Sequence, residues 1–259
     1  MNDSENTLIA HLDALRRTLL RCVTVTALLY PVGYLASPYV INALVQWCFP
    51  ESAGKLHYFA PMEVFWVQLK LALILALALA YPWNMLQLWR FLLPALYDGE
   101  RRVLGWWIVF SSVLFFGGVA FCTGVILPML MNFSGGFTTP ELQPILGLAN
   151  FLNLAGRLML AFGVMFQAPI AVLLAVRFGA ISTESLKRKR PYVMTAILIL
   201  AAILTPPDVV SQLLLAVPTW ILFEIGLLIA ARQQKRREAA AAAELDDAVL
   251  DVYRQDNES

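Results

Sequence analysis

Charged residues are scarce in this sequence. Only 14% of its 259 residues are Asp, Glu, Lys or Arg, whereas hydrophobic residues make up 59%. Water-soluble domains usually carry about 25% charged residues, so this chain has too few to cover a surface that faces water. The shortage disfavours a soluble enzyme, a disordered chain and a nucleic-acid-binding protein. It indicates an integral membrane protein that has the lipid bilayer as its solvent.

Residues that hold metals or form disulfides are also few. The three cysteines, Cys22, Cys48 and Cys122, are widely spaced, and the two histidines lie far apart. This spacing fits neither a disulfide framework nor a metal site. The sequence also lacks a phosphate-binding loop, a zinc-protease motif and a nucleophile elbow. We therefore expect no cofactor and no enzymatic activity. No internal repeat is apparent, which weakens a transporter built from duplicated halves.

Apolar segments provide candidates for helices that cross a bilayer core about 30 Å thick. They cover residues 22–35 (to 40 if the helix absorbs Pro31), 64–81, 104–131, 158–176, 192–204 and 209–231. The fifth has only 13 residues, and Pro218 and Glu224 interrupt the sixth. We expect an all-α domain of six transmembrane helices in residues 1–231. Residues 232–259 are expected to form a charged cytoplasmic tail, disordered or partly helical.

The positions of the basic residues predict the orientation. Of the 19 Lys and Arg residues, 16 lie before the first span, after the last, or in the second–third and fourth–fifth connections. Positively charged flanks stay in the cytoplasm, so both termini are expected there. Residues 37–62, 132–156 and 205–208 then form the outer loops.

Polar residues inside the spans are candidates for function, because they are costly in lipid. Lys70 and Arg157 have a plain alternative, since their long side chains can reach the outer interface. Gln167 directly precedes Pro169 in the fourth span. Its amide either satisfies a backbone carbonyl freed by the proline or is a polar group in a recessed groove.

The final hairpin carries a second set of polar residues. Asp208 follows two prolines and is a candidate amino-terminal cap of the sixth helix. Glu224 lies 15 residues after Val209, which is about 22 Å of helix, so it is expected near the cytoplasmic end. Glu100 lies in a cytoplasmic loop beside two arginines. It is either a solvated charge or an acidic receptor for a basic ligand, because a carboxylate accepts a forked pair of guanidinium hydrogen bonds.

Four segments together resemble the TatC family. They are HLDALRRTLL at 11–20, RFLLPALYDGERR at 90–102, FGVMFQAPIAVLL at 162–174 and LTPPDVVSQLLLAVPTWILFEIG at 204–226. The resemblance implies a receptor subunit of the twin-arginine translocase, which binds twin-arginine signal peptides at its cytoplasmic face. It implies a curved, concave arrangement of six helices, the last two short, in the bacterial inner membrane. It also implies export of folded proteins with the proton-motive force.

The resemblance also implies partners and site residues. The partners are single-span TatA- and TatB-type membrane proteins, the signal peptides of folded cargo, and other copies of the chain. The residues expected to bind signal peptides are Glu100, Phe91, Tyr97, Pro94, Leu96, Asp13, Arg16 and Arg17. Those expected in the groove or at the partner surface are Gln167, Pro169, Thr205, Pro206, Asp208, Gln212 and Glu224.

The sequence departs from the family pattern at two positions. Ala14 stands where the family often has Glu, and Asp13 points about 100° away around the helix, so it cannot simply replace that carboxylate. Glu100 is then the matched acidic candidate for the arginine pair. Gln167 stands where the family has Glu, which argues against obligatory proton carriage there.

Two other classes of protein remain as alternatives. A secondary transporter or channel would need a substrate site near the middle of the membrane, with broken helices in both halves. The polar residues here gather instead at the cytoplasmic face and in one hairpin. A membrane enzyme would need a nucleophile or metal cluster, which this sequence lacks.

Overall fold

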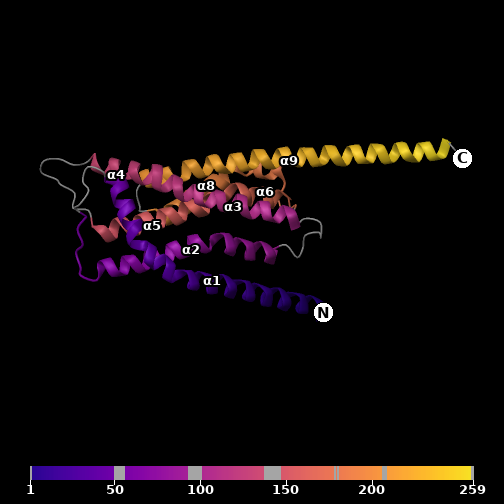
Figure 1. The fold of residues 1–259 in the computed structure, drawn as a ribbon. Helices are drawn as coiled ribbons and strands as arrows, with labels where there is room; N and C mark the ends of the chain where they lie inside the picture. The colour runs from indigo at the N-terminus through magenta and orange to yellow at the C-terminus, as the bar shows by residue number, and fades with distance from the viewer. Residues whose placement is uncertain are drawn as a thin grey trace. The chain divides into compact units, whose positions relative to one another are not determined.

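The protein is described here from a computed structural model. It describes residues 2–49, 56–92, 101–136, 147–177, 179, 181–205 and 209–257. The helices in these ranges are α1 (Asn2–Cys48), α2 (Glu63–Leu92), α3 (Arg101–Phe121), the π-helical segment η2 (Cys122–Ile126), α4 (Leu127–Gly135), α5 (Leu148–Met165), α6 (Ala168–Arg177), α7 (Thr183–Arg188), α8 (Arg190–Leu204) and α9 (Val209–Asn257) (Figure 1). The expected all-α fold is confirmed.

The helices match the predicted spans in number. Five stretches are long and apolar enough to cross a membrane: Leu12–Cys48, Glu63–Phe91, Gly105–Ser134, Leu148–Arg177 and Val209–Arg236. The sixth is the shorter apolar helix α8, whose 15 residues span about 22 Å. The short fifth span is therefore confirmed. The expected short sixth helix is only the first part of the 49-residue α9.

Three predicted loop boundaries are wrong. Helix α1 continues to Cys48 and α4 ends only at Gly135, so both run into the predicted outer loops. The fourth span begins at Leu148 instead of residue 158. The sequence reading took Arg157 as a border between loop and helix. In the structure the apolar residues 148–156 are already helical, and Arg157 is an exposed side chain within α5.

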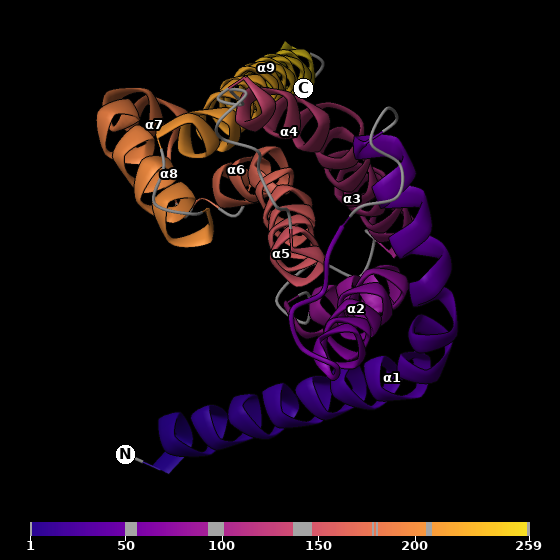
Figure 2. The same ribbon diagram turned by 90° about the vertical axis from the view of Figure 1, so that its left-hand side faces the viewer.

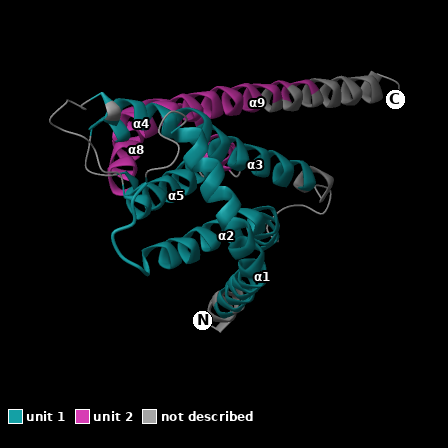
Figure 3. Cartoon of the chain, turned by 60° about the vertical axis from the view of Figure 1, so that its left-hand side comes forward, with its two compact units in different colours: residues 1–166, 204–211 teal, residues 167–203, 212–259 magenta. Residues whose placement is uncertain are grey.

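The described residues divide into two compact units. The first contains residues 1–166 and 204–211, and the second contains 167–203 and 212–259 (Figure 3). In the first unit α1 packs mainly along α2, and α2 also packs against α5 (Figure 2). Gly33 allows this close approach, because a Cβ there would lie 2.4 Å from the Ala72 carbonyl oxygen.

Helix α1 contains two prolines, Pro31 and Pro38, and bends along its course in Figure 2. Proline has no N–H and so leaves the carbonyl four residues earlier without its helical donor. The buried Ser37 hydroxyl donates to the Tyr34 carbonyl at 2.8 Å, which is the carbonyl that Pro38 leaves free. The hydroxyl thus satisfies a polar group that lipid could not.

Glu63 organises one end of the first unit. Its Oε2 accepts hydrogen bonds from the backbone N–H groups of Phe59 (2.6 Å) and Ala60 (3.1 Å), and its Oε1 accepts from that of Ala149 (3.3 Å). The Leu148 N–H also donates to the His57 carbonyl at 2.9 Å. The first turns of α2 and α5 are therefore fastened to each other and to the segment that precedes α2.

The second unit contains α6, α7, α8 and most of α9. Ser182 caps α7 by accepting from the Ser185 N–H at 3.1 Å, and the Thr183 hydroxyl donates to Gln234 Oε1 at 2.8 Å. Gly226 on α9 lies against Pro169 on α6, where a Cβ would be 2.6 Å from the proline Cα. Beyond Arg236, α9 continues through REAAAAAELDD, whose residues mostly favour helix.

The Gly226 contact leads to a prediction about stability. Gly226→Ala should lower the melting temperature of the detergent-solubilised protein, because backbone atoms of Pro169 must shift to admit the methyl group. Overpacking of this kind costs about 1–3 kcal/mol. Gly117→Ala is the control, since a Cβ there has no atom within 4 Å. Equal melting temperatures for the two variants would contradict the contact.

Candidate functional site

The antiparallel pairing of α1 and α2 defines one end of the candidate site. Asn84 Nδ2 on α2 donates to Thr26 Oγ1 on α1 at 3.3 Å. From this point α2 runs seven residues on to Phe91, while α1 runs back by the same length to about residue 19. Continuing the register therefore places Phe91 at about the level of residue 19, two to three residues from Arg17 and Arg16 along α1. Phe91 on α2 and Arg16 and Arg17 on α1, which were expected to bind signal peptides, lie toward the same end of this antiparallel helix pair.

Asp13 is engaged on its own helix. Its Oδ2 accepts from the Arg17 guanidinium at 2.8 Å, one helical turn away, and both side chains are exposed. Exposed pairs at this spacing are worth about 0.3–0.5 kcal/mol, so a competing cation can displace Arg17 at little cost. Four other expected contacts, Pro94, Leu96, Tyr97 and Glu100, lie outside the described residues.

Gln167 and Pro169 lie where the fourth span is interrupted. Helix α5 ends at Met165 and α6 begins at Ala168, with Gln167 half-buried in the turn between them. The Gln167 carbonyl accepts from the Ala171 N–H at 3.0 Å and so starts the next helix. Pro169 is buried in the first turn of α6, where the missing N–H has no helical partner to lose.

The polar residues of the final hairpin serve its own packing. Gln212 Nε2 on α9 donates to the Leu198 carbonyl on α8 at 3.1 Å. Thr205 is buried, with 7% of its surface exposed. Its hydroxyl is therefore not on an open surface. Pro206 and Asp208 lie outside the described residues, so the proposed cap is not tested.

Glu224 has a partner that the sequence did not reveal. Its Oε2 accepts from the Arg190 guanidinium at 2.6 Å, with 25% of the Glu224 side chain and 44% of the Arg190 side chain exposed. Arg190 is the first residue of α8 and Glu224 lies midway through the apolar part of α9. The pair joins the two helices at the end opposite their connecting turn. It also neutralises a carboxylate that would be costly in lipid.

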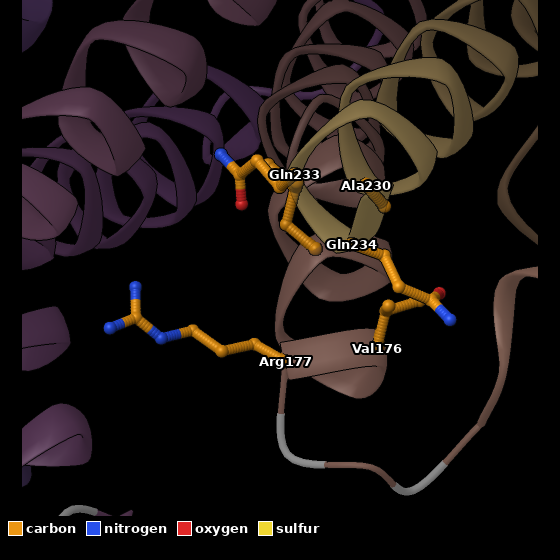
Figure 4. A pocket seen from close by; sticks show the side chains of 6 residues that line it. Val176, Arg177, Ala230, Gln233 and Gln234 are labelled. Atoms are coloured by element: carbon orange, nitrogen blue, oxygen red, sulfur yellow. The ribbon is translucent and has the colours of Figure 1, made fainter. Parts of the chain in front are cut away.

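A small cavity of about 90 Å³ lies between α6 and α9. Figure 4 shows Arg177 and Gln233 extending to one side of it and Gln234 and Val176 to the other. Its lining contains no nucleophile paired with a base and no group of metal ligands. Among the residues that the structure describes, no cluster of His, Cys, Asp or Glu could hold a metal ion.

Comparison with known families decides what these helices belong to. The sequence model described as "Sec-independent protein translocase protein (TatC)" matches residues 10–218. The chain belongs to the TatC family. It is a component of the twin-arginine translocase and a multi-pass bacterial membrane protein, and its homologues are transport proteins rather than enzymes.

Individual TatC proteins match over most of their length. The TatC of Azotobacter chroococcum mcd 1 is 35% identical over 234 residues, covering 89% of this chain and 91% of the relative. The TatC of Escherichia coli K12 is 35% identical over 222 residues, covering 85% and 86%. The crystal structure of the twin arginine translocase receptor TatC in DDM superposes with a TM-score of 0.78 at 28% identity. It covers 85% of this chain and 99% of that one.

The structural roles of two residues in this TatC chain, Glu63 and Arg190, were not predicted from the sequence. Glu63 lies three residues after Ala60 at the start of an apolar run, which is the position of the acidic residue in a capping box. That pattern could have revealed its role at the start of α2. Arg190 was interpreted only as part of a basic anchor, and no local pattern pairs it with a residue 34 positions away.

The two ion pairs should differ in strength. A double-mutant cycle on Arg190 and Glu224, with alanine at each, should give a coupling energy of about 1 kcal/mol or more, because Glu224 is largely buried. The same cycle on Asp13 and Arg17 should give about 0.5 kcal/mol or less, because that pair is exposed. Thermal unfolding in detergent measures both. Equal coupling energies would show that burial does not strengthen the hairpin pair.

Proposed function

We propose that this chain is the receptor subunit that binds twin-arginine signal peptides at its cytoplasmic face. The observation that supports the proposal is the antiparallel pairing of α1 and α2, in which Phe91 and the arginines Arg16 and Arg17 lie toward the same end. The described start of the RFLLPALYDGERR segment, at the end of α2, and the basic part of α1 lie toward the same end of the pair, which supports a site shared by the two. A peptide that approaches this end would contact both the HLDALRRTLL segment of α1 and the RFLLPALYDGERR segment that begins in α2.

Glu100 supplies the electrostatic part of the proposal. A carboxylate binds the planar guanidinium through two parallel hydrogen bonds, which lysine cannot form. Asp13 would first have to release Arg17, at a cost of about 0.3–0.5 kcal/mol, so it is a slightly poorer acceptor for an incoming arginine. Glu100 is thus the main contact for the arginine pair, with Phe91, Pro94, Leu96 and Tyr97 packing against the neighbouring peptide.

The orientation is part of the same proposal. The 16 basic residues at the termini and the two connections place those segments in the cytoplasm of the bacterial inner membrane. The proposed peptide site is on the side that the basic residues assign to the cytoplasm, because it lies at the basic end of α1 and α2. The proposal takes the proton-motive force as the energy source for export of folded cargo.

The hairpin of α8 and α9 is proposed as the surface for single-span TatA- and TatB-type partners. On α9, Leu213, Val217 and Ile221 repeat every four residues and are 49%, 53% and 53% exposed. Ile203 on α8 is 73% exposed. A transmembrane helix of a partner could pack against this exposed apolar stripe and cover the short helix α8. Thr205 is buried, and the Gln212 amide group already donates within the hairpin. Apolar packing therefore contributes more to the binding of a partner helix than polar contacts do. Other copies of the chain are further proposed partners.

Replacement of Glu100 tests peptide binding. Glu100→Ala should weaken binding of a twin-arginine signal peptide about 10- to 150-fold, since hydrogen bonds to charged groups are worth about 1.5–3 kcal/mol. Glu100→Gln should also weaken it, because the amide keeps the shape but loses the charge. Binding is measured with a labelled peptide and the full chain in lipid nanodiscs.

Two control variants make this result specific. Glu184→Gln removes an exposed carboxylate from α7, changes the net charge equally, and should leave the affinity unchanged. Asp13→Asn should have a smaller effect than Glu100→Gln. Wild-type affinity in both Glu100 variants would overturn the assignment, and a larger loss in Asp13→Asn would transfer the role to Asp13.

A further inference from the structure

Two positively charged side chains lie within the apolar helices of the first unit. Lys70 belongs to the span formed by α2 and Arg157 to α5, and both side chains are exposed. In the part of this unit whose side chains the structure describes, the carboxylates are those of Asp13, which binds Arg17, and Glu63, which accepts from backbone N–H groups. Neither cation forms an ion pair with a described residue. A charge inside a span is costly unless it is paired or faces water.

The two cations lie on one surface of α2 and α5. The helices begin side by side, since Glu63 Oε1 accepts from the Ala149 N–H at 3.3 Å. Lys70 Nζ donates to Asn153 Oδ1 at 3.5 Å, so these two residues are level. Arg157 follows Asn153 by one turn on the same side of α5. An arginine side chain in lipid extends toward the nearer interface, which brings the Arg157 guanidinium toward the level of the Lys70 ammonium group.

The donors of both cations are largely unused within the described residues. Lys70 has three N–H donors, and the one bond printed by its contact with Asn153 is long for an N–H···O bond. No described residue accepts from Arg157. The two like charges also repel each other strongly in a medium of low dielectric constant. An anion between them would use the free donors and remove the repulsion.

The depth of the pair indicates which anion reaches it. The end at which α2 begins carries the exposed aromatic residues Trp47, Tyr58, Phe59 and Trp66, and tryptophan and tyrosine mark the level of the lipid headgroups. Lys70 lies four residues farther along α2 than Trp66, or about 6 Å. The pair is therefore on the hydrocarbon side of the headgroups. A carboxylate fixed on a transmembrane helix can lie at this depth, whereas a lipid phosphate stays with the headgroups.

A hollow between α2 and α5 opens onto this position. Its volume is about 510 Å³, and its lining includes Trp66, Val67, Lys70, Ala149 and Asn153. The Lys70 ammonium group is thus accessible from the surface of the helix pair. Only the small side chain of Ala149 and the amide of Asn153 border it on α5 among these residues.

We propose that Lys70 and Arg157 together bind the carboxylate of an Asp or Glu in the transmembrane helix of a partner protein. The guanidinium fork takes both carboxylate oxygens, and the ammonium group donates to a remaining lone pair. The partner helix carries its acidic residue about one turn inside the aromatic level of the membrane. This charged surface on the first unit goes beyond the apolar stripe of α8 and α9, and it does not depend on the proposed signal-peptide site.

A synthetic single-span peptide is the probe that tests the proposal. A Leu–Ala helix carries Glu one turn inside a terminal Trp, and a matched peptide carries Gln there. Energy transfer between labelled peptide and labelled full chain is measured in phosphatidylcholine nanodiscs. The wild type should bind the Glu peptide about tenfold more tightly than the Gln peptide. Lys70→Gln and Arg157→Gln should each reduce this preference. Lys187→Gln, which makes the same change at an exposed position of α7, should retain it.

Charge reversal separates recognition from a failure to fold. Arg157→Glu should lose the Glu peptide and bind a peptide with Lys at that position. Signal-peptide affinity, measured in the same variants, should stay at the wild-type value, so a failure here is distinct from a failure of the proposed receptor function.

Two results would overturn the proposal. The first is equal affinity of the wild type for the Glu and Gln peptides, or a full preference in both Lys70→Gln and Arg157→Gln. The second is retention of phosphatidylglycerol over phosphatidylcholine in native mass spectrometry that requires Arg157, without any preference between the peptides. That outcome would assign the two cations to a lipid phosphate.

Discussion

Hydrogen bonding in a medium without water is the constraint on which this structure depends. A backbone N–H or C=O exposed to lipid costs several kcal/mol, so each segment that crosses the bilayer must pair its own polar groups as a helix. Where proline interrupts that pairing, another group takes its place, as Ser37 does for the Tyr34 carbonyl beside Pro38. Where helices begin, a side chain such as Glu63 or Ser182 accepts from the free N–H groups. The ends of the helices are therefore where this chain places its polar chemistry.

The same constraint explains the position of the charged groups. The Glu224 carboxylate inside an apolar helix is compensated by Arg190 at the start of the neighbouring helix. Lys70 donates to Asn153 Oδ1 at 3.5 Å, which gives its ammonium group a polar partner within the first unit. Arginines such as Arg16 and Arg17 lie near the end of the helix pair and remain exposed. A site for a charged peptide belongs at such an end, because the charged residues of the protein that bind the peptide stay near water there and avoid the free-energy cost of burial in lipid.

The sequence predicted the helices well, because hydropathy reports directly on the cost of crossing lipid. It failed at boundaries where local patterns conflict. Arg157 looked like the end of a loop, yet a long side chain can reach the interface from within a helix, and α5 begins nine residues earlier. Residues 232–259 were expected to form a tail that is disordered or partly helical, and α9 runs through this segment as far as Asn257.

The candidate site was predictable only in part. Family motifs pointed to Phe91, Asp13 and the arginines of α1, and in the pairing of α1 with α2 Phe91 and those arginines lie toward the same end. The ion pair of Asp13 with Arg17 follows from their spacing of four residues. The partners of Glu224 and Asn84 did not follow from the sequence, because each depends on a contact between helices distant in sequence.

Photo-crosslinking from position 91 tests whether the cytoplasmic end of α1 and α2 binds the signal peptide. A photoreactive phenylalanine analogue in place of Phe91 is illuminated with a twin-arginine signal peptide, in inverted and in right-side-out inner-membrane vesicles. A crosslink is expected in inverted vesicles only, and a weaker one when both arginines of the peptide are lysines. A crosslink of equal yield in right-side-out vesicles, or equal yields for the arginine and lysine peptides, would contradict a guanidinium-reading site at the cytoplasmic end of α1 and α2.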